Sequence, residues 1–163
     1  MIIAIDPGLT TGYVIATSPT QLVEVGDVNP FEDVLEIIDM MRSRGDLELV
    51  ICESFSLYSG KQNAQSFSNM PSSQAIGMLK HYCQTHNVEL VMQGPLERKV
   101  ITKDMLRAVG YWQALRGLHH AKDAAMHLLL YYTKQPKWQG KLWEIYSEKG
   151  LFSDGNESSV ETK

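Results

Sequence analysis

Runs of apolar residues separated by turn-forming residues predict a sheet in the first third of the chain. Residues 1–5 are continuously apolar and rich in β-branched side chains, which is typical of a strand buried on both faces. A Pro7-Gly8 turn follows, and residues 11–17 and 21–25 read as two further strands. These three strands predict an antiparallel meander. Residues 47–52 form the next apolar strand, and residues 88–92 form a fifth.

Helix signals lie between and after these strands. Asn29, Pro30 and Glu32 offer an N-cap, a proline at the first helical position and a capping-box glutamate, and apolar residues then recur at helical spacing as far as Gly45. Further helices are predicted over residues 71–85, after an N-cap at Thr102, and from residue 119 to about 133. Residues 54–69 are polar and predict a long surface loop. The pattern assigns no role to residues 134–149.

This order of elements predicts an α/β fold of three layers, with a mixed sheet between helices. A chain of 163 residues with 44% hydrophobic residues can bury one core, so a two-lobed enzyme is excluded. We therefore expect one domain over residues 1–149. Residues 150–163 are rich in Ser, Asp, Glu and Gly and predict a flexible acidic tail.

The net charge of −4 conceals an uneven distribution of charge along the chain. Residues 1–96 carry 4 Lys and Arg against 11 Asp and Glu, whereas residues 97–149 carry 10 against 5. The basic segment is compatible with a face that meets phosphate, and a solvated helix surface is the alternative. No apolar run approaches the roughly 20 residues that span a bilayer, so we expect a cytoplasmic protein. Cys52 and Cys83 lack metal-site or disulfide spacing.

Two acidic residues end predicted strands, and their position suggests chemistry. Asp6 follows the first strand and Glu53 follows the fourth. Burying an unpaired carboxylate is costly, and open α/β sheets usually bind ligands at the carboxyl ends of their strands. Divalent metal binding explains both acids. The alternative is that each one accepts hydrogen bonds from the backbone of the following loop.

A third element strengthens the metal hypothesis. His120 and Asp123 lie three residues apart and share one face of the predicted helix over residues 119–133. Together with Asp6 and Glu53 they would supply oxygen and nitrogen ligands to two Mg²⁺ or Mn²⁺ ions, a pair that can drive phosphodiester hydrolysis. His119 and His127 are weaker candidates, because a single histidine on a helix is more often structural than a ligand.

Three stretches resemble the RuvC-type Holliday-junction resolvases, a family of the RNase H-like, retroviral-integrase superfamily. Residues 2–13, IIAIDPGLTTGY, are similar to the opening of that family. Residues 50–53, VICE, resemble its second acidic strand, and residues 120–125, HAKDAA, resemble its closing helix. The three stretches occur in the family order, and the resemblance covers roughly residues 1–133.

The resemblance implies an RNase H-like fold with a five-stranded mixed sheet. It also implies that Asp6, Glu53, His120 and Asp123 are catalytic and bind two Mg²⁺ ions per site, for which Mn²⁺ can substitute. The expected activity is that of a crossover junction endodeoxyribonuclease in DNA recombination and repair. The family acts as a homodimer that cuts a four-way junction symmetrically. Compact relatives of this kind are often carried by bacteriophages.

The resemblance also indicates candidate DNA contacts. In the family the loop after the second acid carries an aromatic residue that contacts bases, and a basic region farther along contacts phosphates. A solvated basic face is the alternative for the basic region. The resulting candidates for DNA binding are Phe55, Tyr58, Lys61, Lys99, Lys103 and Arg107.

Other functions remain open at this stage. A ribonuclease H-type enzyme acting on RNA/DNA hybrids would use the same fold and metals, and a catalytically inactive junction-binding protein would share the fold. Flaps, forks and replication bubbles are alternative branched substrates. The Asp-x-Gly-x-Thr stretch at residues 6–10 also opens the phosphate-binding hairpin of actin-like ATPases and sugar kinases. Those proteins need two such domains, and this chain can build one.

Overall fold

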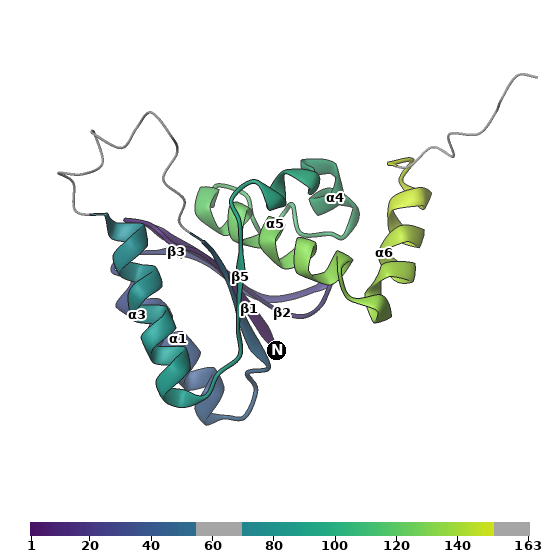
Figure 1. Ribbon diagram of the computed structural model, residues 1–163. Helices are drawn as coiled ribbons and strands as arrows, with labels where there is room; N and C mark the ends of the chain where they lie inside the picture. The colour runs from purple at the N-terminus through teal and green to yellow at the C-terminus, as the bar shows by residue number, and fades with distance from the viewer. Residues whose placement is uncertain (55–69, 152–163) are drawn as a thin grey trace, which may run out of the picture.

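The computed structural model describes residues 1–54 and 70–151. A five-stranded mixed sheet lies between two layers of helices (Figure 1), which confirms the predicted α/β architecture. The elements follow one another as β1 Ile2–Asp6, β2 Thr11–Ser18, β3 Gln21–Val28, α1 Glu32–Ser43, β4 Leu49–Glu53, α3 Pro71–His86, β5 Leu90–Gln93, the 3₁₀ helix η1 Glu97–Val100, α4 Lys103–Ala108, α5 His119–Thr133 and α6 Pro136–Glu148.

The strand order is β3-β2-β1-β4-β5, and it brings the two strand-ending acids together. Strands β1, β2 and β3 pair antiparallel, as the meander predicted, whereas β4 pairs parallel with both β1 and β5. Ile5 lies opposite Cys52 in the β1–β4 ladder. The next residue on each strand is therefore an acid, and Asp6 and Glu53 end at the same edge of the sheet.

Alternation along the strands divides the core into two clusters. Ala4 and Ile51 point toward α4, α5 and α6, whereas Ile3, Ile5 and Val50 point toward α1 and α3. All five side chains are fully buried. Successive residues of a strand face opposite sides of the sheet, so a strand covered on both faces must be apolar throughout. This explains the continuous apolar character of residues 2–5.

The approach between α5 and the sheet depends on small residues. Ala121, Ala124 and Ala125 are completely buried along the inner face of α5. Opposite them, a Cβ atom at Gly12 of β2 would overlap the backbone of His120 and Ala121. A larger residue at position 12 would therefore hold α5 away from the sheet. The close fit fixes where the N-terminal turns of α5 lie relative to β1.

The predicted start of α1 was wrong. The helix begins at Glu32 after Phe31, and no side chain caps it, so Asn29 is not the N-cap and no capping box forms. Phe31 is only 8% exposed and packs with the α1 and α3 core, and this burial sets the start of the helix. The predicted cap at Thr102 is confirmed, because its Oγ1 accepts a hydrogen bond from the backbone N–H of Met105 at 3.2 Å.

The remaining described residues complete the helical layer. Residues 134–149, which the sequence left without a role, contain α6, and Leu142 and Tyr146 of this helix are buried. Cys52 and Cys83 are buried free thiols. Among the described helices none combines the length and apolar character needed to cross a bilayer.

Candidate active site

The strand-ending acid Asp6 contacts the predicted helix histidine. Nδ1 of His120 lies 3.0 Å from Oδ2 of Asp6, although 114 positions separate them in the sequence. The Asp6 side chain is 14% exposed and His120 is 45% exposed, so the pair lies at the edge of the core with the imidazole facing outward. Two of the four predicted metal ligands are thus in direct contact.

Glu53 is held by a histidine that the sequence analysis had set aside. Oε2 of Glu53 lies 2.8 Å from Nε2 of His127, and Nδ1 of the same ring lies 2.7 Å from Oε1 of Gln93 at the end of β5. An ionised carboxylate can only accept, so Nε2 of His127 carries the hydrogen. Because both ring nitrogens are engaged and the ring is fully buried, His127 orients Glu53 and is not itself a metal ligand.

Gln93 shows how this small network is completed. Its Nε2 atom is buried and has no hydrogen-bond partner among the described residues. Exchanging the amide nitrogen and oxygen of Gln93 would let the nitrogen donate to Nδ1 of His127 and leave an acceptor without a partner, which costs less than an orphaned donor. The exchanged arrangement is the one that fits a ring with its single hydrogen on Nε2, pointing at Glu53, because the amide oxygen of Gln93 cannot donate to Nδ1.

Arg98 joins Glu53 to Asp123, the last predicted ligand. Its Nε atom lies 3.2 Å from Oε2 of Glu53, and its Nη1 atom pairs with Oδ1 of Asp123. The three side chains are 19–34% exposed. Burial would lower the pKa of Arg98, but the charges of Asp123 and Glu53 outweigh it, so that pKa is raised above its usual value.

The first turn of α5 is anchored by Asp27 of β3. The carboxylate of Asp27 accepts hydrogen bonds from the backbone N–H of Ala121 at 2.6 Å and of His120 at 3.4 Å. Free N–H groups and the helix dipole both favour an anion at this end of a helix. Gly12 of β2 pairs with Asp27 of β3 on one side and with Asp6 of β1 on the other. These three neighbouring residues of the sheet therefore position the start of α5 and orient His120 toward Asp6.

The electrostatics of the site favour an added cation. The pKa of Asp6 is raised from 3.8 to about 6, chiefly because burial disfavours the charged form; the charges of Glu53 and Asp123 add to the rise, and the hydrogen bond with His120 opposes it. Three carboxyl groups and one guanidinium meet here, so acidic groups outnumber basic ones. Carboxylate and imidazole donors suit Mg²⁺ or Mn²⁺. As they stand, no three His, Cys, Asp or Glu side chains of the described ranges are grouped closely enough to hold one ion.

The candidate DNA contacts fall into two groups. Phe55, Tyr58 and Lys61 lie outside the described residues. Lys99 on η1 and Lys103 on α4 are exposed, and so is Arg107, which pairs with Asp104.

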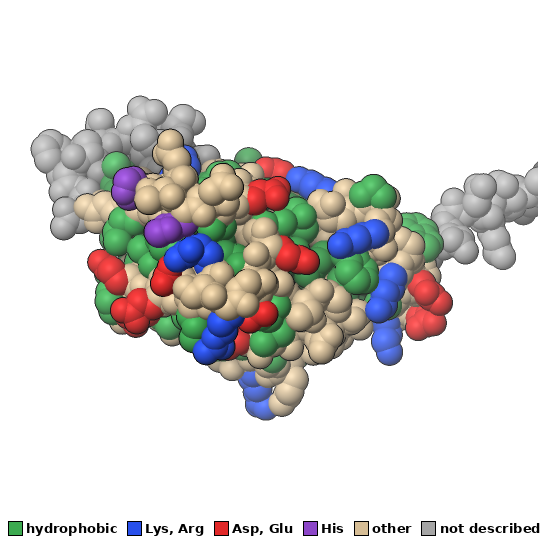
Figure 2. All heavy atoms as spheres, turned by 90° about the horizontal axis from the view of Figure 1, so that it is seen from below, with side chains coloured by type: hydrophobic (Ala, Val, Ile, Leu, Met, Phe, Trp, Pro, Cys, Tyr) green, Lys and Arg blue, Asp and Glu red, His purple; other side chains and the backbone are tan. Residues whose placement is uncertain are grey.

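Trp112 organises two cations near the site. The guanidinium carbon of Arg107 lies 4.4 Å from the ring centroid of Trp112, and Nζ of Lys122 lies 4.9 Å from it, both within cation–π range. Lys122 directly precedes Asp123 in α5. These cations form a local group, whereas the face in Figure 2 intersperses acidic and basic side chains over the described surface.

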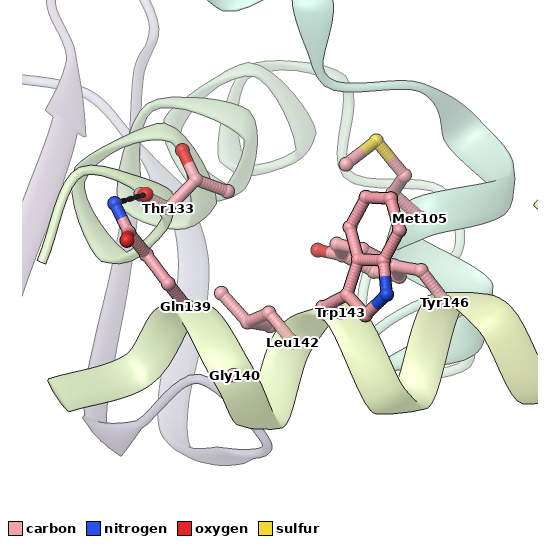
Figure 3. A pocket seen from close by; sticks show the side chains of 7 residues that line it. All are labelled: Met105, Thr133, Gln139, Gly140, Leu142, Trp143 and Tyr146. Atoms are coloured by element: carbon pink, nitrogen blue, oxygen red, sulfur yellow. Dashed lines mark hydrogen bonds between the residues drawn. The ribbon is translucent and has the colours of Figure 1, made fainter. Parts of the chain in front are cut away.

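A separate apolar pocket of about 510 Å³ lies between the helices on the α5 side of the sheet. Figure 3 shows Leu142, Trp143 and Tyr146 projecting from α6 toward Met105 of α4 and Thr133 at the end of α5. None of the seven lining residues is charged. The pocket therefore lacks the carboxylate and imidazole groups that hold a metal ion and is distinct from the carboxylate site.

No protein-family model matches the sequence, and no curated protein matches it significantly. Solved structures do share the fold. RuvC of Thermus thermophilus in complex with a Holliday junction substrate aligns with a TM-score of 0.53 and 17% identity, over 91% of this chain and 95% of that chain. A second T. thermophilus RuvC structure gives 0.52 and 18% identity, covering 91% and 96%.

A viral protein gives the same result. The fowlpox virus resolvase, in complex with its substrate Holliday junction DNA, aligns with a TM-score of 0.51 and 16% identity, over 88% of this chain and 99% of that chain. At such identities the likeness establishes the fold. The chain thus has the RuvC-like, RNase H-type fold that the sequence predicted.

Proposed function

We propose that this chain is a metal-dependent endonuclease that resolves four-way DNA junctions. The observation that carries the proposal is the convergence of Asp6, Glu53, His120 and Asp123 at one edge of a RuvC-like sheet. Arg98 links Glu53 to Asp123, and His127 of α5 contacts Glu53 of β4. The solved structures of this fold include two bound to Holliday junctions, which supports the substrate class.

The proposed metal ligands are Asp6, Glu53, His120 and Asp123. Their oxygen and nitrogen donors suit two Mg²⁺ ions, with Mn²⁺ as a substitute. The ions would compensate the excess of acidic over basic groups at the site. When bound, such a pair activates a water molecule and stabilises the leaving oxygen in phosphodiester hydrolysis.

The protein's own side chains prepare this arrangement. His120 contacts Asp6 from α5 and holds its Oδ2 atom at the outer edge of β1. His127 donates to Glu53 from inside the core and fixes the rotamer of that carboxylate. Asp27 anchors the first turn of α5, which carries His120 and leads into the turn that carries Asp123. Asp123 pairs with Arg98 of η1, so each proposed ligand has a partner whose contact a small shift of α5 would disturb.

The proposed phosphate contacts lie on the side of the site formed by η1, α4 and α5. Lys99, Lys103 and Arg107 are exposed there, and we add Lys122 because Trp112 holds it close to Arg107. Cations of this kind neutralise phosphates and position the substrate without reading its sequence. The aromatic candidates Phe55 and Tyr58, with Lys61, keep their proposed role in contacting the junction.

A homodimer completes the proposal, because two symmetric sites would match the two-fold symmetry of a four-way junction. Residues 1–149 would form the nuclease domain of each subunit. Incubation with a labelled four-way junction, a flap, a linear duplex and an RNA/DNA hybrid, each with Mg²⁺, Mn²⁺ or EDTA, tests the substrate class. We expect metal-dependent cutting of the junction. Cutting confined to the hybrid would instead establish a ribonuclease H-type enzyme.

A further inference from the structure

Arg98 occupies a position that the proposed metal ions also need. Its guanidinium contacts Glu53, at the end of β4, and Asp123, in the second turn of α5, so one cation ties the sheet to the helix. The Arg98 side chain is 25% exposed. A cation held between two carboxylates from different elements is a structural counter-ion and not a freely solvated surface charge.

The segment that carries Arg98 is itself fixed. Glu97, its neighbour in η1, accepts a hydrogen bond from the backbone N–H of Gly94 at 2.6 Å and pairs with Lys134, just after α5, at 2.7 Å. Glu97 therefore fastens η1 both to the turn after β5 and to the end of α5. The guanidinium reaches the carboxylates from a backbone that is already in place, so forming the contact requires no further ordering of the backbone.

The contact with Glu53 is one that a metal ion could replace. Nε of Arg98 lies within ion-pair distance of Glu53, yet it has no hydrogen-bond partner among the described residues. The attraction there is coulombic and poorly aligned, whereas Glu53 keeps a well-placed donor in His127. Moving Arg98 away from Glu53 would therefore leave the charge of that carboxylate uncompensated, but His127 would still hold the carboxylate in its orientation.

A divalent ion held by Glu53 and Asp123 would share these two carboxylates with the guanidinium of Arg98. An ion between Glu53 and Asp123 would lie a few ångströms from Arg98, where two cations repel strongly at the edge of a protein core. The present arrangement of the described residues contains no cluster of three ligands around one point. Arg98 lies between two of the four proposed ligands.

We propose that Arg98 is the resident cation of the carboxylate site, and that a divalent ion enters only by displacing its guanidinium from Glu53 and Asp123. The inference rests on the proposed function, since it takes these carboxylates to be metal ligands. Arg98 then stabilises the metal-free protein and weakens metal binding. Once displaced, the guanidinium stays near the site on η1 and requires another anion as its partner.

The test is a calorimetric titration of the full chain with Mn²⁺ alone, in the absence of DNA, combined with thermal unfolding with and without Mn²⁺. Arg98→Gln removes the charge and Arg98→Lys keeps a charge that cannot bridge both carboxylates. Arg44→Gln is the matched control, because Arg44 is exposed beyond α1 on the other face of the sheet. Glu53→Gln reports whether the titrated ion enters this site.

We expect Arg98→Gln to bind Mn²⁺ about tenfold more tightly than the unaltered chain, to unfold at a lower temperature without metal, and to gain more stability from Mn²⁺. Arg98→Lys should lie between the two, Arg44→Gln should change nothing, and Glu53→Gln should lose the binding. Unchanged or weaker Mn²⁺ binding in a folded Arg98→Gln overturns the role of Arg98 alone. Absence of saturable Mn²⁺ binding in every variant overturns both this inference and the proposed function.

Discussion

Gly12 and His120 are 108 positions apart, and the backbone of His120 fills the space where a side chain at Gly12 would begin. The same contact sets the height of α5 above the sheet and thereby the distance from His120 to Asp6. Core packing and site geometry are thus a single constraint at this point. Adding one methyl group at Gly12 would therefore move His120 and lower the proposed cleavage activity, although no charged residue is altered.

Gly12→Ala is therefore expected to destabilise the fold by about 3 kcal/mol, the upper range for overpacking, because the obstacle is backbone that cannot rotate away. Cleavage activity should fall further than stability at a temperature where the variant is still folded. Gly77→Ala is the control, since nothing lies within 4 Å of a Cβ atom at that helical position. Chemical denaturation and junction cleavage measure both. Equal effects of the two substitutions would refute the coupling of packing to the site.

Asp27 supplies a second, separable constraint on α5. Asp27→Ala removes the acceptor for two backbone N–H groups and should cost about 1 kcal/mol of stability, the usual value of a helix cap. Asp27→Asn should restore most of it, because the amide oxygen still accepts. Thermal unfolding compares these with Glu36→Gln, an exposed position on α1. A loss in the Asn variant as large as in the Ala variant would show that charge matters and capping does not.

The buried imidazole of His127 orients Glu53, so His127→Ala should act on both stability and catalysis. The substitution leaves a cavity and two polar partners without a donor or acceptor, at a cost of about 3 kcal/mol. His119→Ala, at an exposed position on the same helix, should be neutral. The sharper readout is Mn²⁺ affinity, which should drop about tenfold or more in His127→Ala. A folded variant with full Mn²⁺ affinity would exclude the positioning role.

The cations at Trp112 predict a salt-dependent effect on DNA binding. Arg107→Gln and Lys122→Gln should each weaken junction binding and reduce the slope of affinity against salt concentration by about one unit. Lys80→Gln, at an exposed position on α3 across the sheet, should leave the slope unchanged. Fluorescence anisotropy with a catalytically inactive Asp6→Asn background measures these slopes. Identical slopes in all three variants would show that Arg107 and Lys122 do not contact DNA phosphates.

Local patterns predicted much of the fold because they reflect local physics. The apolar run of residues 2–5 predicted a strand covered on both faces, and the Thr102 cap predicted the start of α4. The start of α1 was missed because burial of Phe31 outweighed the capping signals at Asn29.

For the site, the sequence predicted Asp6, Glu53, Asp123 and the Asp6 partner His120, but not the partners Arg98 and His127. Asp6 and Glu53 could be singled out because a carboxylate after an apolar strand is unusual. Arg98 was one of several cations in a basic segment. Nothing in that segment shows that its side chain contacts Glu53 of β4 and Asp123 of α5. His127 carried one usable signal, its spacing of four residues from Asp123 on the same helix. The pairing of Asp27 with α5 depends on sheet register, which a single sequence does not reveal.

The most direct measurement compares the unaltered chain with Asp6→Asn on a synthetic four-way junction labelled on each strand in turn. We expect paired incisions on two strands of like polarity with Mg²⁺ and none in Asp6→Asn. The variant should still bind the junction, because one negative charge near phosphate is removed. Incisions that persist in Asp6→Asn, or binding that disappears together with cleavage in a folded variant, would contradict the assignment of this carboxylate edge as the active site.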